Sequence, residues 1–132
     1  MKTTFDVLTW LYTILNVASV TTTIDGEVWK SKPPADRVCR DIVINSLPIS
    51  WGPDVQDGII NVNCYCKDLD NGVRDESNLK AMTDAAIARL LAYSNTTGVY
   101  FHYEIENQAV YNDHDRPGMS YSNIRVKFYY ET

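Results

Sequence analysis

Basic residues are scarce in this chain, and the motifs that mark common chemistries are missing. Twelve lysines and arginines stand against seventeen acidic residues, which gives a net charge of −5. No basic stripe of the kind that neutralises phosphates is present, so a role in gripping free nucleic acid is disfavoured. The sequence also lacks a phosphate-binding loop, a zinc-spaced ligand set and a nucleophile beside a base. We therefore expect no enzyme, no cofactor and no metal.

Cysteine is also sparse, with three in the chain. Cys64 and Cys66 are two residues apart in a segment that reads as a strand, so they share one face. A bridge between them would strain the disulfide geometry. We interpret them and Cys39 as small buried hydrophobes of a protein in a reducing cytosol.

Long apolar runs are absent. The apolar stretch near the start is interrupted by Asp6, Thr9 and Asn16 and is not followed by a small-residue cleavage site, so we expect no signal peptide. No run approaches the roughly 20 apolar residues of a membrane span. With 132 residues and 45% hydrophobic content, the chain is predicted to form one domain, 1–132, in the cytoplasm.

Two stretches have apolar residues at helical spacing, 4–17 and 76–92. Thr3 or Thr4 is the expected N-cap of the first helix, and Asp75 of the second. The apolar stripe of the second helix contains Leu79, Met82, Ala86 and Leu90, joined by Ile87 and Leu91.

The remaining pattern is typical of strands. β-Branched runs flank Asp25-Gly26, which predicts a hairpin over 20–30. Further strands are predicted at 41–46, 58–67, 99–106 and 124–130, with a helix exit at 94–98. Within 58–67, the alternation assigns Ile60, Val62, Cys64 and Cys66 to the core side, and leaves Asn61, Asn63 and Tyr65 on a wet or partner-facing side.

The last two predicted strands are expected to pair antiparallel, because Glu104 and Glu106 on one would face Arg125 and Lys127 on the other. Each helix has a single apolar stripe that needs a surface to cover it. The element order therefore predicts an α+β fold, an antiparallel β-sheet with two amphipathic helices packed on one face.

Two polar loops, 47–57 and 111–120, are long for simple connections and are candidate partner-contact loops. Their candidate residues are Trp51, Asp54, Asp113, His114, Asp115 and Arg116. A metal site at 113–115 is disfavoured, because consecutive loop residues rarely converge on one ion. The turn at 68–72 lacks the register of a calcium loop, whose twelfth position would be Leu79.

The order of the elements resembles the tail-terminator or tail-completion proteins of long-tailed phages and their prophages. The resemblance covers nearly the whole chain. Its best local match is the alternating strand 58–67, followed by the helix with the pattern L-x-x-M-x-x-x-A-x-x-x-L, a polar loop and the final strand I-R-V-K-F at 124–128. The hairpin over 20–30 departs from the family's first strand.

The resemblance implies a structural protein that works as a ring, commonly hexameric, in the virion tail after assembly in the bacterial host cytoplasm. The ring caps the tail tube, ends its polymerisation and joins tail to head. Its partners would be further copies of the chain, the tail tube protein and the head-connector protein, with no membrane. DNA would pass without specific binding, which fits an acidic wall. The alternatives are another neck or minor tail component, or a small ligand-binding or hydrolytic α+β domain.

Overall fold

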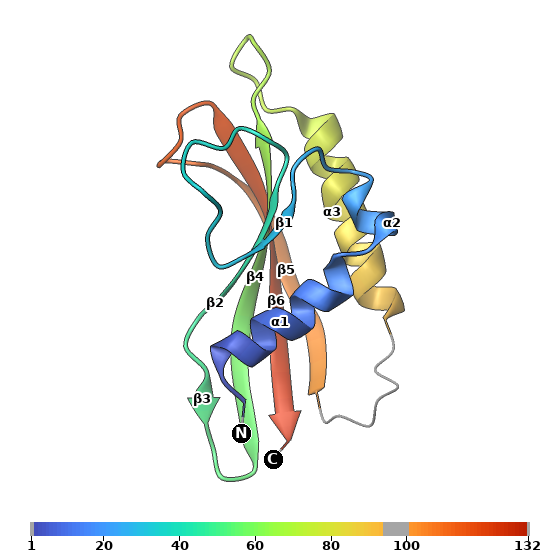
Figure 1. Cartoon of the computed structure of the whole chain (residues 1–132), viewed down its shortest axis with the longest axis vertical. Helices are drawn as coiled ribbons and strands as arrows, with labels where there is room; N and C mark the ends of the chain where they lie inside the picture. Colours follow the sequence, from blue (N-terminus) through green and yellow to red (C-terminus); the bar gives the residue numbers. More distant parts are fainter. Residues whose placement is uncertain (1, 94–100, 132) are drawn as a thin grey trace.

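A computed structural model describes residues 2–93 and 101–131 (Figure 1). Its fold is α+β. The helices are α1 (Thr4–Leu15), α2 (Ala18–Thr21) and α3 (Glu76–Ala92). The strands are β1 (Val28–Lys30), β2 (Ile42–Ser46), β3 (Ser50–Trp51), β4 (Val55–Lys67), β5 (Phe101–Asn112) and β6 (Met119–Glu131). The predicted helix exit at 94–98 and the start of the strand predicted at 99–106 lie outside the described residues.

The strands form one mixed sheet in the order β1-β2-β4-β6-β5, and β3 pairs with β4 beyond the end of β2. All pairs are antiparallel except β1 with β2, which run parallel. The expectation of a purely antiparallel sheet is therefore wrong. The reason is the connection 31–41. It leads the chain from the end of β1 back to the level where β1 began, so β2 then runs in the same direction as β1.

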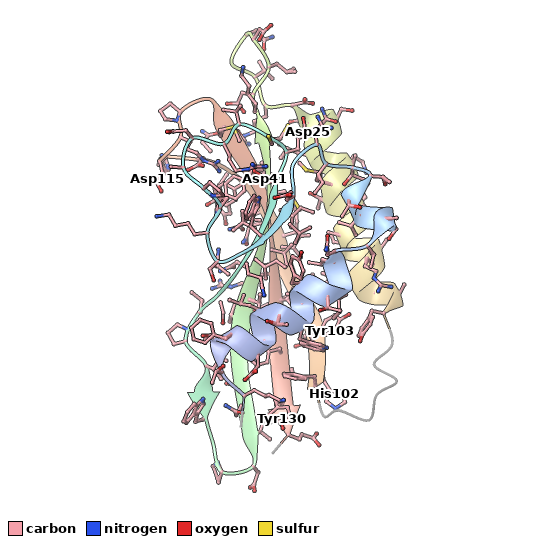
Figure 2. All side chains as sticks on the ribbon, in the orientation of Figure 1. Asp25, Asp41, His102, Tyr103, Asp115 and Tyr130 are labelled. Carbon is pink, nitrogen blue, oxygen red and sulfur yellow. The ribbon has the colours of Figure 1, made fainter. Side chains whose placement is uncertain are left out.

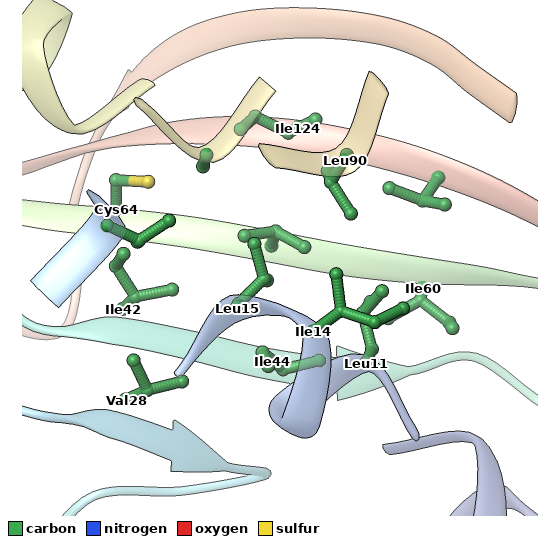
Figure 3. Close-up of a cluster of buried hydrophobic side chains, with 14 of the residues drawn as sticks. Leu11, Ile14, Leu15, Val28, Ile42, Ile44, Ile60, Cys64, Leu90 and Ile124 are labelled. Atoms are coloured by element: carbon green, nitrogen blue, oxygen red, sulfur yellow. The ribbon is translucent and has the colours of Figure 1, made fainter. Parts of the chain in front are cut away.

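Both long helices cover the same side of the sheet (Figure 1). Helix α1 packs over β1 and β2, and α3 packs over β4 and β6. The core between them joins Leu11 and Leu15 of α1 to Leu90 of α3 and Ile124 of β6 (Figure 3). The core side of β4 is confirmed, because Ile60, Val62, Cys64 and Cys66 are all buried in this cluster.

The predicted hairpin over 20–30 is wrong. Val20 is fully buried in the short helix α2, and only the last three residues of the stretch form a strand, β1. The Asp25 carboxylate accepts a hydrogen bond from the Arg40 amide at 2.7 Å, and the Gly26 amide donates to the Arg40 carbonyl at 3.0 Å. Asp-Gly therefore closes a contact with a distant segment instead of turning a local hairpin.

The two expected loops are shorter than the sequence suggests. In 47–57, β3 and the start of β4 form a small hairpin, with Trp51 opposite Gln56. In 111–120, β5 and β6 extend the ladder until only 113–118 remains as a turn. Both corrections have the same cause. Residues with a composition typical of loops form strands here, because each lies beside a strand with which its backbone can pair.

Two side-chain predictions also need correction. Glu104 does lie opposite Lys127, but a bulge between Ile105 and Asn107 puts Asn107 opposite Arg125, so Glu106 has no basic partner across the ladder. Leu91 does not join the stripe of α3, because its side chain is 73% exposed.

The caps follow the sequence. Thr3 is the N-cap of α1 and forms a capping box with Asp6, while the Asp75 carboxylate accepts from the Asn78 amide at the start of α3. Within the described residues, no helix combines the length and apolarity that crossing a membrane requires.

Candidate functional site

The side of the sheet away from the helices, called here the open face, displays a row of asparagines. Asn61 donates from Nδ2 to Oδ1 of Asn45 at 3.2 Å, which joins β4 to β2. Asn123 on β6 donates from Nδ2 to Oδ1 of Asn61 at 3.1 Å and of Asn63 at 2.7 Å. These amides satisfy one another across three strands, so the polar groups of this face have hydrogen-bond partners within the sheet.

A cluster of tyrosines continues the open face toward the end of the sheet that carries the β5–β6 turn. The ring centres of Tyr65 and Tyr121 are 5.0 Å apart, and those of Tyr111 and Tyr121 are 5.6 Å apart. Burial, together with the nearby charge of Asp113, raises the pKa of Tyr65. The three side chains have apolar rings and polar tips of the kind enriched in protein interfaces.

Residues 31–40, called here the strap, cross over the open face and are attached to the sheet by Asp41. This carboxylate is 1% exposed and accepts four hydrogen bonds. Its Oδ1 accepts from the Glu27 amide at 2.8 Å and the Trp29 indole at 3.1 Å, and the Arg37 guanidinium donates to both oxygens at 2.9 and 3.0 Å. Asp41 thus joins β1, the strap and the start of β2 at one point (Figure 2).

The electrostatics of Asp41 follow from these contacts. Burial by itself would raise the pKa of the Asp41 carboxyl, but the hydrogen bonds from Arg37, Glu27 and Trp29 outweigh it and hold the pKa below its usual value. The guanidinium of Arg37 also lies 4.9 Å from the Trp29 ring centre. The sequence analysis did not predict this site. A signal was present, because Arg37 lies four residues before Asp41, the acidic residue that directly precedes β2.

An open hollow of about 480 Å³ lies between the strap, the open face and the β5–β6 turn. Pro33 and Pro34 of the strap, Tyr65 of β4 and Arg116 of the turn are among its lining residues. The Arg116 guanidinium lies 4.6 Å from the Tyr65 ring centre and donates to the Arg37 carbonyl at 2.9 Å. The turn and the strap therefore support each other.

The structure separates the candidate residues into two groups at opposite ends of the long strands. Trp51 and Asp54 lie in the β3–β4 hairpin, where Val55 pairs with Glu131 at the end of β6. Residues 113–116 lie in the turn beyond the other end of β4 (Figure 2). The thirteen residues of β4 span about 40 Å at about 3.3 Å per residue. One partner of ordinary size would not contact both groups at once.

Within the second group, the residues divide by role. The Asp113 carboxylate pairs with Arg116 at 2.8 Å and accepts from the Asp115 amide at 3.1 Å, so Asp113 and Arg116 stabilise the turn itself. His114 and Asp115 remain exposed. In the first group, Trp51 is 60% exposed and Asp54 is exposed as well. The side chains available to partners are therefore Trp51, Asp54, His114 and Asp115.

The residues that could bind a metal or act as a nucleophile do not converge. In the part of the chain that the structure describes, no three His, Cys, Asp or Glu side chains are placed to hold an ion. Cys39, Cys64 and Cys66 are free thiols, and Cys64 and Cys66 are buried as predicted. The same interpretation is wrong for Cys39, which is only partly buried because it lies in the strap and not in the sheet. Burial raises the pKa of Cys64 to about 12 and of Cys66 to about 11, which leaves little thiolate for chemistry.

Comparisons with known proteins add little to this picture. No family model matches the chain, and no curated protein sequence matches it. One similar solved structure is the type 4 fimbrial biogenesis protein PilO from Pseudomonas aeruginosa, with 9% identity and a TM-score of 0.33. The match covers 67% of this chain and 53% of that chain, so this chain spans about half the length of PilO as solved. A likeness this slight carries no argument about function.

Proposed function

We propose that this protein is a structural component of a phage or prophage tail, a subunit of a ring that caps the tail tube, ends its polymerisation and joins the tail to the head. The observation that carries the proposal is the placement of exposed apolar side chains at two opposite ends of one sheet. The family resemblance of the sequence supplies the biological setting.

The first end is that of the β3–β4 hairpin. It exposes Leu47, Trp51 and Val55, and the first turn of α1, which contains the exposed Phe5, starts near the same end (Figure 1). Lys2 and Gln56 join the two segments, because each donates a hydrogen bond to the other, at 2.8 and 3.1 Å. Exposed apolar side chains gathered in one region are typical of protein-binding surfaces.

The second end carries Val38 of the strap, Leu69 and Val73 of the β4–α3 connection, and Tyr111 beside the β5–β6 turn. Of the large apolar side chains that the described residues expose, only Leu91 on α3 lies away from both ends. A subunit with two such ends, about 40 Å apart along the strands, can contact a tube on one side and a connector on the other. This two-ended arrangement supports a joining role over a role in binding a small ligand.

The test uses the phage or prophage that carries the gene. Deleting the gene is expected to give overlong tails without heads, and a plasmid copy of the wild-type gene is expected to restore normal particles. Tails of normal length that still lack heads would favour the alternative of a neck component. Tails of normal length joined to heads would rule the proposal out.

Complementation with point variants then examines the two ends separately. Trp51→Ser removes the largest apolar side chain of the hairpin end, and Val73→Ser changes the opposite end. Each is expected to reduce infective particles, with electron micrographs showing a defect at only one junction. Leu91→Ser is the matched control, because Leu91 is equally apolar and exposed but belongs to neither end. A control as defective as the two variants would contradict the argument.

A further inference from the structure

Among the strands that the structure describes, β5 forms one edge of the sheet, and β1, with β3 further along, forms the other. Edge strands of stable monomers are usually protected by proline, charge, a bulge or a covering element. The half of β5 before Asn107 has such protection, with Glu104, Glu106 and the bulge. The half Asn107–Asn112, with the sequence NQAVYN, contains no proline, charge or bulge. At its end, Oδ1 of Asn112 accepts from the Arg74 guanidinium at 3.1 and 3.2 Å, a side-chain contact that leaves the backbone of this half available for pairing with another strand.

The two edges lie in the same rows of the sheet. One row runs from Val28 of β1 through Ile42, Cys64 and Ser122 to Val110 of β5. The next rows join Trp29 to Ala109 and Lys30 to Gln108 in the same way. Along the strand direction, β1 therefore lies level with residues 108–110 of β5, at the opposite edge of the sheet.

The free backbone groups of the two edges match. In β1, the Glu27 carbonyl and the Ser31 amide bond to β2, so in the alternation of a strand Val28 and Lys30 direct their amides and carbonyls outward. The Lys30 carbonyl also accepts from the Lys32 amide at 2.9 Å, which leaves one of its two lone pairs for a partner strand. In β5, the Asp113 amide bonds to the Met119 carbonyl, which continues the ladder with β6. By the same alternation Val110 and Gln108 direct their groups outward.

The strand directions match as well. The β5 strand runs opposite to β6, β6 opposite to β4, β4 opposite to β2, and β1 parallel to β2, so β1 and β5 run in opposite directions. Placed beside β5 at the same height, the β1 strand of a second copy would pair Val28 with Val110 and Lys30 with Gln108. Both would be hydrogen-bonded pairs of an antiparallel ladder.

The side chains fit this pairing. Trp29 would lie beside Ala109 on the open face, a large ring against the smallest side chain of the edge. Val28 would meet Val110 on the helix side, where both already pack against the core. Just beyond the paired residues, Lys32 follows β1 and Glu106 precedes Gln108, so opposite charges would lie close together.

Each edge also borders an open hollow between the edge strand and the helix above it. The hollow beside β1 is about 570 Å³, with Tyr12 and Asn16 of α1 in its lining. The hollow beside β5 is about 280 Å³, with Leu79 and Thr83 of α3 in its lining. Neither edge is therefore covered by the helix that packs next to it.

We propose that copies of this chain join head to tail, the β1 edge of one copy pairing with Asn107–Asn112 of the next, to form a closed ring with a continuous sheet. The contact is heterologous, and pairing within the same rows keeps the shift along the strands small, which favours a closed ring over a helical filament. This inference deepens the ring part of the proposed function and names its contact surface, but it does not depend on what the ring caps.

The test is disulfide trapping with Lys30→Cys and Gln108→Cys together, in full-length protein that also has Cys39→Ser. Opposite residues of a hydrogen-bonded pair have Cα atoms about 5.5 Å apart, within the range of a disulfide. Under mild oxidation we expect a ladder of covalent oligomers that ends at one closed species. The matched control carries Lys30→Cys with Asp54→Cys, since Asp54 is exposed but lies at the β3–β4 end.

Pre-oriented pairing should make the ladder form about tenfold faster, or more, than the control, in which thiols meet only by collision. Equal rates would overturn the inference. Efficient dimers from Gln108→Cys alone would also overturn it, because they indicate a symmetric β5–β5 contact. The gene deletion remains a separate test of the proposed function. If the deletion leaves tails normal while the protein still forms rings, tail capping is refuted but the proposed contact between β1 and β5 is not.

Should the double variant fail to fold, as judged by circular dichroism, zero-length crosslinking of the wild-type chain decides instead. A mixture of ¹⁴N- and ¹⁵N-labelled protein is treated with a carbodiimide, which joins lysine to carboxylate. Mixed-label peptides that link Lys30 or Lys32 to Glu106 would support the pairing. Their absence among the mixed-label crosslinks would overturn it.

Discussion

Replacing Asp41 by asparagine is expected to be among the most destabilising polar substitutions in this chain. The amide keeps the shape of the side chain and one acceptor, so the Glu27 amide and the Trp29 indole can still donate to Oδ1. The other position becomes an NH₂ group that faces the Nε–H of Arg37, where the carboxylate accepted at 2.9 Å. Two donors then meet at this position, and of the two guanidinium hydrogen bonds only the one from Nη2 to Oδ1, at 3.0 Å, can remain.

The magnitude follows from the burial of the pair. Hydrogen bonds to charged groups contribute about 1.5–3 kcal/mol each, and removing one partner of a buried ion pair costs about 3–5 kcal/mol. Arg37 retains 25% side-chain exposure and can recover part of its hydration, so the loss should be at the lower end. We expect Asp41→Asn to lower the free energy of unfolding by about 2–3 kcal/mol.

The effect should depend on pH in a defined direction. Because the folded-state pKa of Asp41 is lowered, the unfolded chain binds more protons than the folded chain as pH falls. The stabilisation is thus fully present above the unfolded pKa of about 4 and is lost as pH falls through the lower folded pKa. Wild type and Asp41→Asn should therefore converge in stability below about pH 4.

Urea titrations followed by circular dichroism measure these differences. The matched control is Asp84→Asn, which removes the same charge from an exposed i,i+4 pair with Lys80. Exposed pairs contribute at most about 1 kcal/mol, so the control should be close to wild type at pH 7. If Asp41→Asn were no more destabilising than Asp84→Asn, or if its effect persisted unchanged at low pH, the account of Asp41 would be refuted.

Three further expectations concern the core, the thiols and metal content. Val62→Ala should cost about 1–3 kcal/mol in a denaturant titration, because the side chain is fully buried, whereas Val55→Ala at a 42% exposed position should cost little; similar values for both would contradict the assigned faces. A thiol reagent should modify Cys39 in the native protein long before Cys64, whose burial raises its pKa to about 12; equal rates would mean that the core opens. Elemental analysis of purified protein is expected to show no stoichiometric zinc or iron, and one ion per chain would direct attention to His114.

The parts of the fold that the sequence predicted share one property, which is that neighbours along the chain decide them. The capping box at Thr3 and the stripe of α3 lie within a few residues of sequence. The alternation in β4 assigns its core side without knowledge of any partner, because successive side chains must point to opposite faces. The expectation that the other side would be wet or partner-facing was wrong for Asn63, which is 7% exposed and accepts from Asn123.

The errors arose where distant residues decide the local structure. β-Branched residues around Asp25-Gly26 favour a hairpin, yet the groups that satisfy this turn come from Arg40, fifteen residues later. Gly26 itself is held so close to Asp41 that a Cβ would lie 2.0 Å from its carboxylate oxygen. These contacts place β1 parallel to β2, and the residues around Asp25-Gly26 contain no pattern from which that pairing could be predicted.

The candidate residues show the same division. Their polarity, exposure and position in turns are local properties, and Trp51 and His114 are exposed as their surroundings suggested. Their distribution over two ends, about 40 Å apart, depends on the register of β4 with β6. Asp113 and Arg116 form an ion pair that stabilises the turn. That role depends on tertiary contacts, because Arg116 also packs against Tyr65 and donates to the Arg37 carbonyl of the strap.

By itself, then, the amino-acid sequence determined the two long helices, the core side of the long strand and the absence of common catalytic motifs, because each depends on spacing within a few residues. Only the tertiary structure decided the strand order, the burial of Asp41 and the matching rows of the two free edges. These depend on pairing between segments far apart in the chain, where hydrogen-bond partners and register are set by the whole sheet and not by the residues of any one strand.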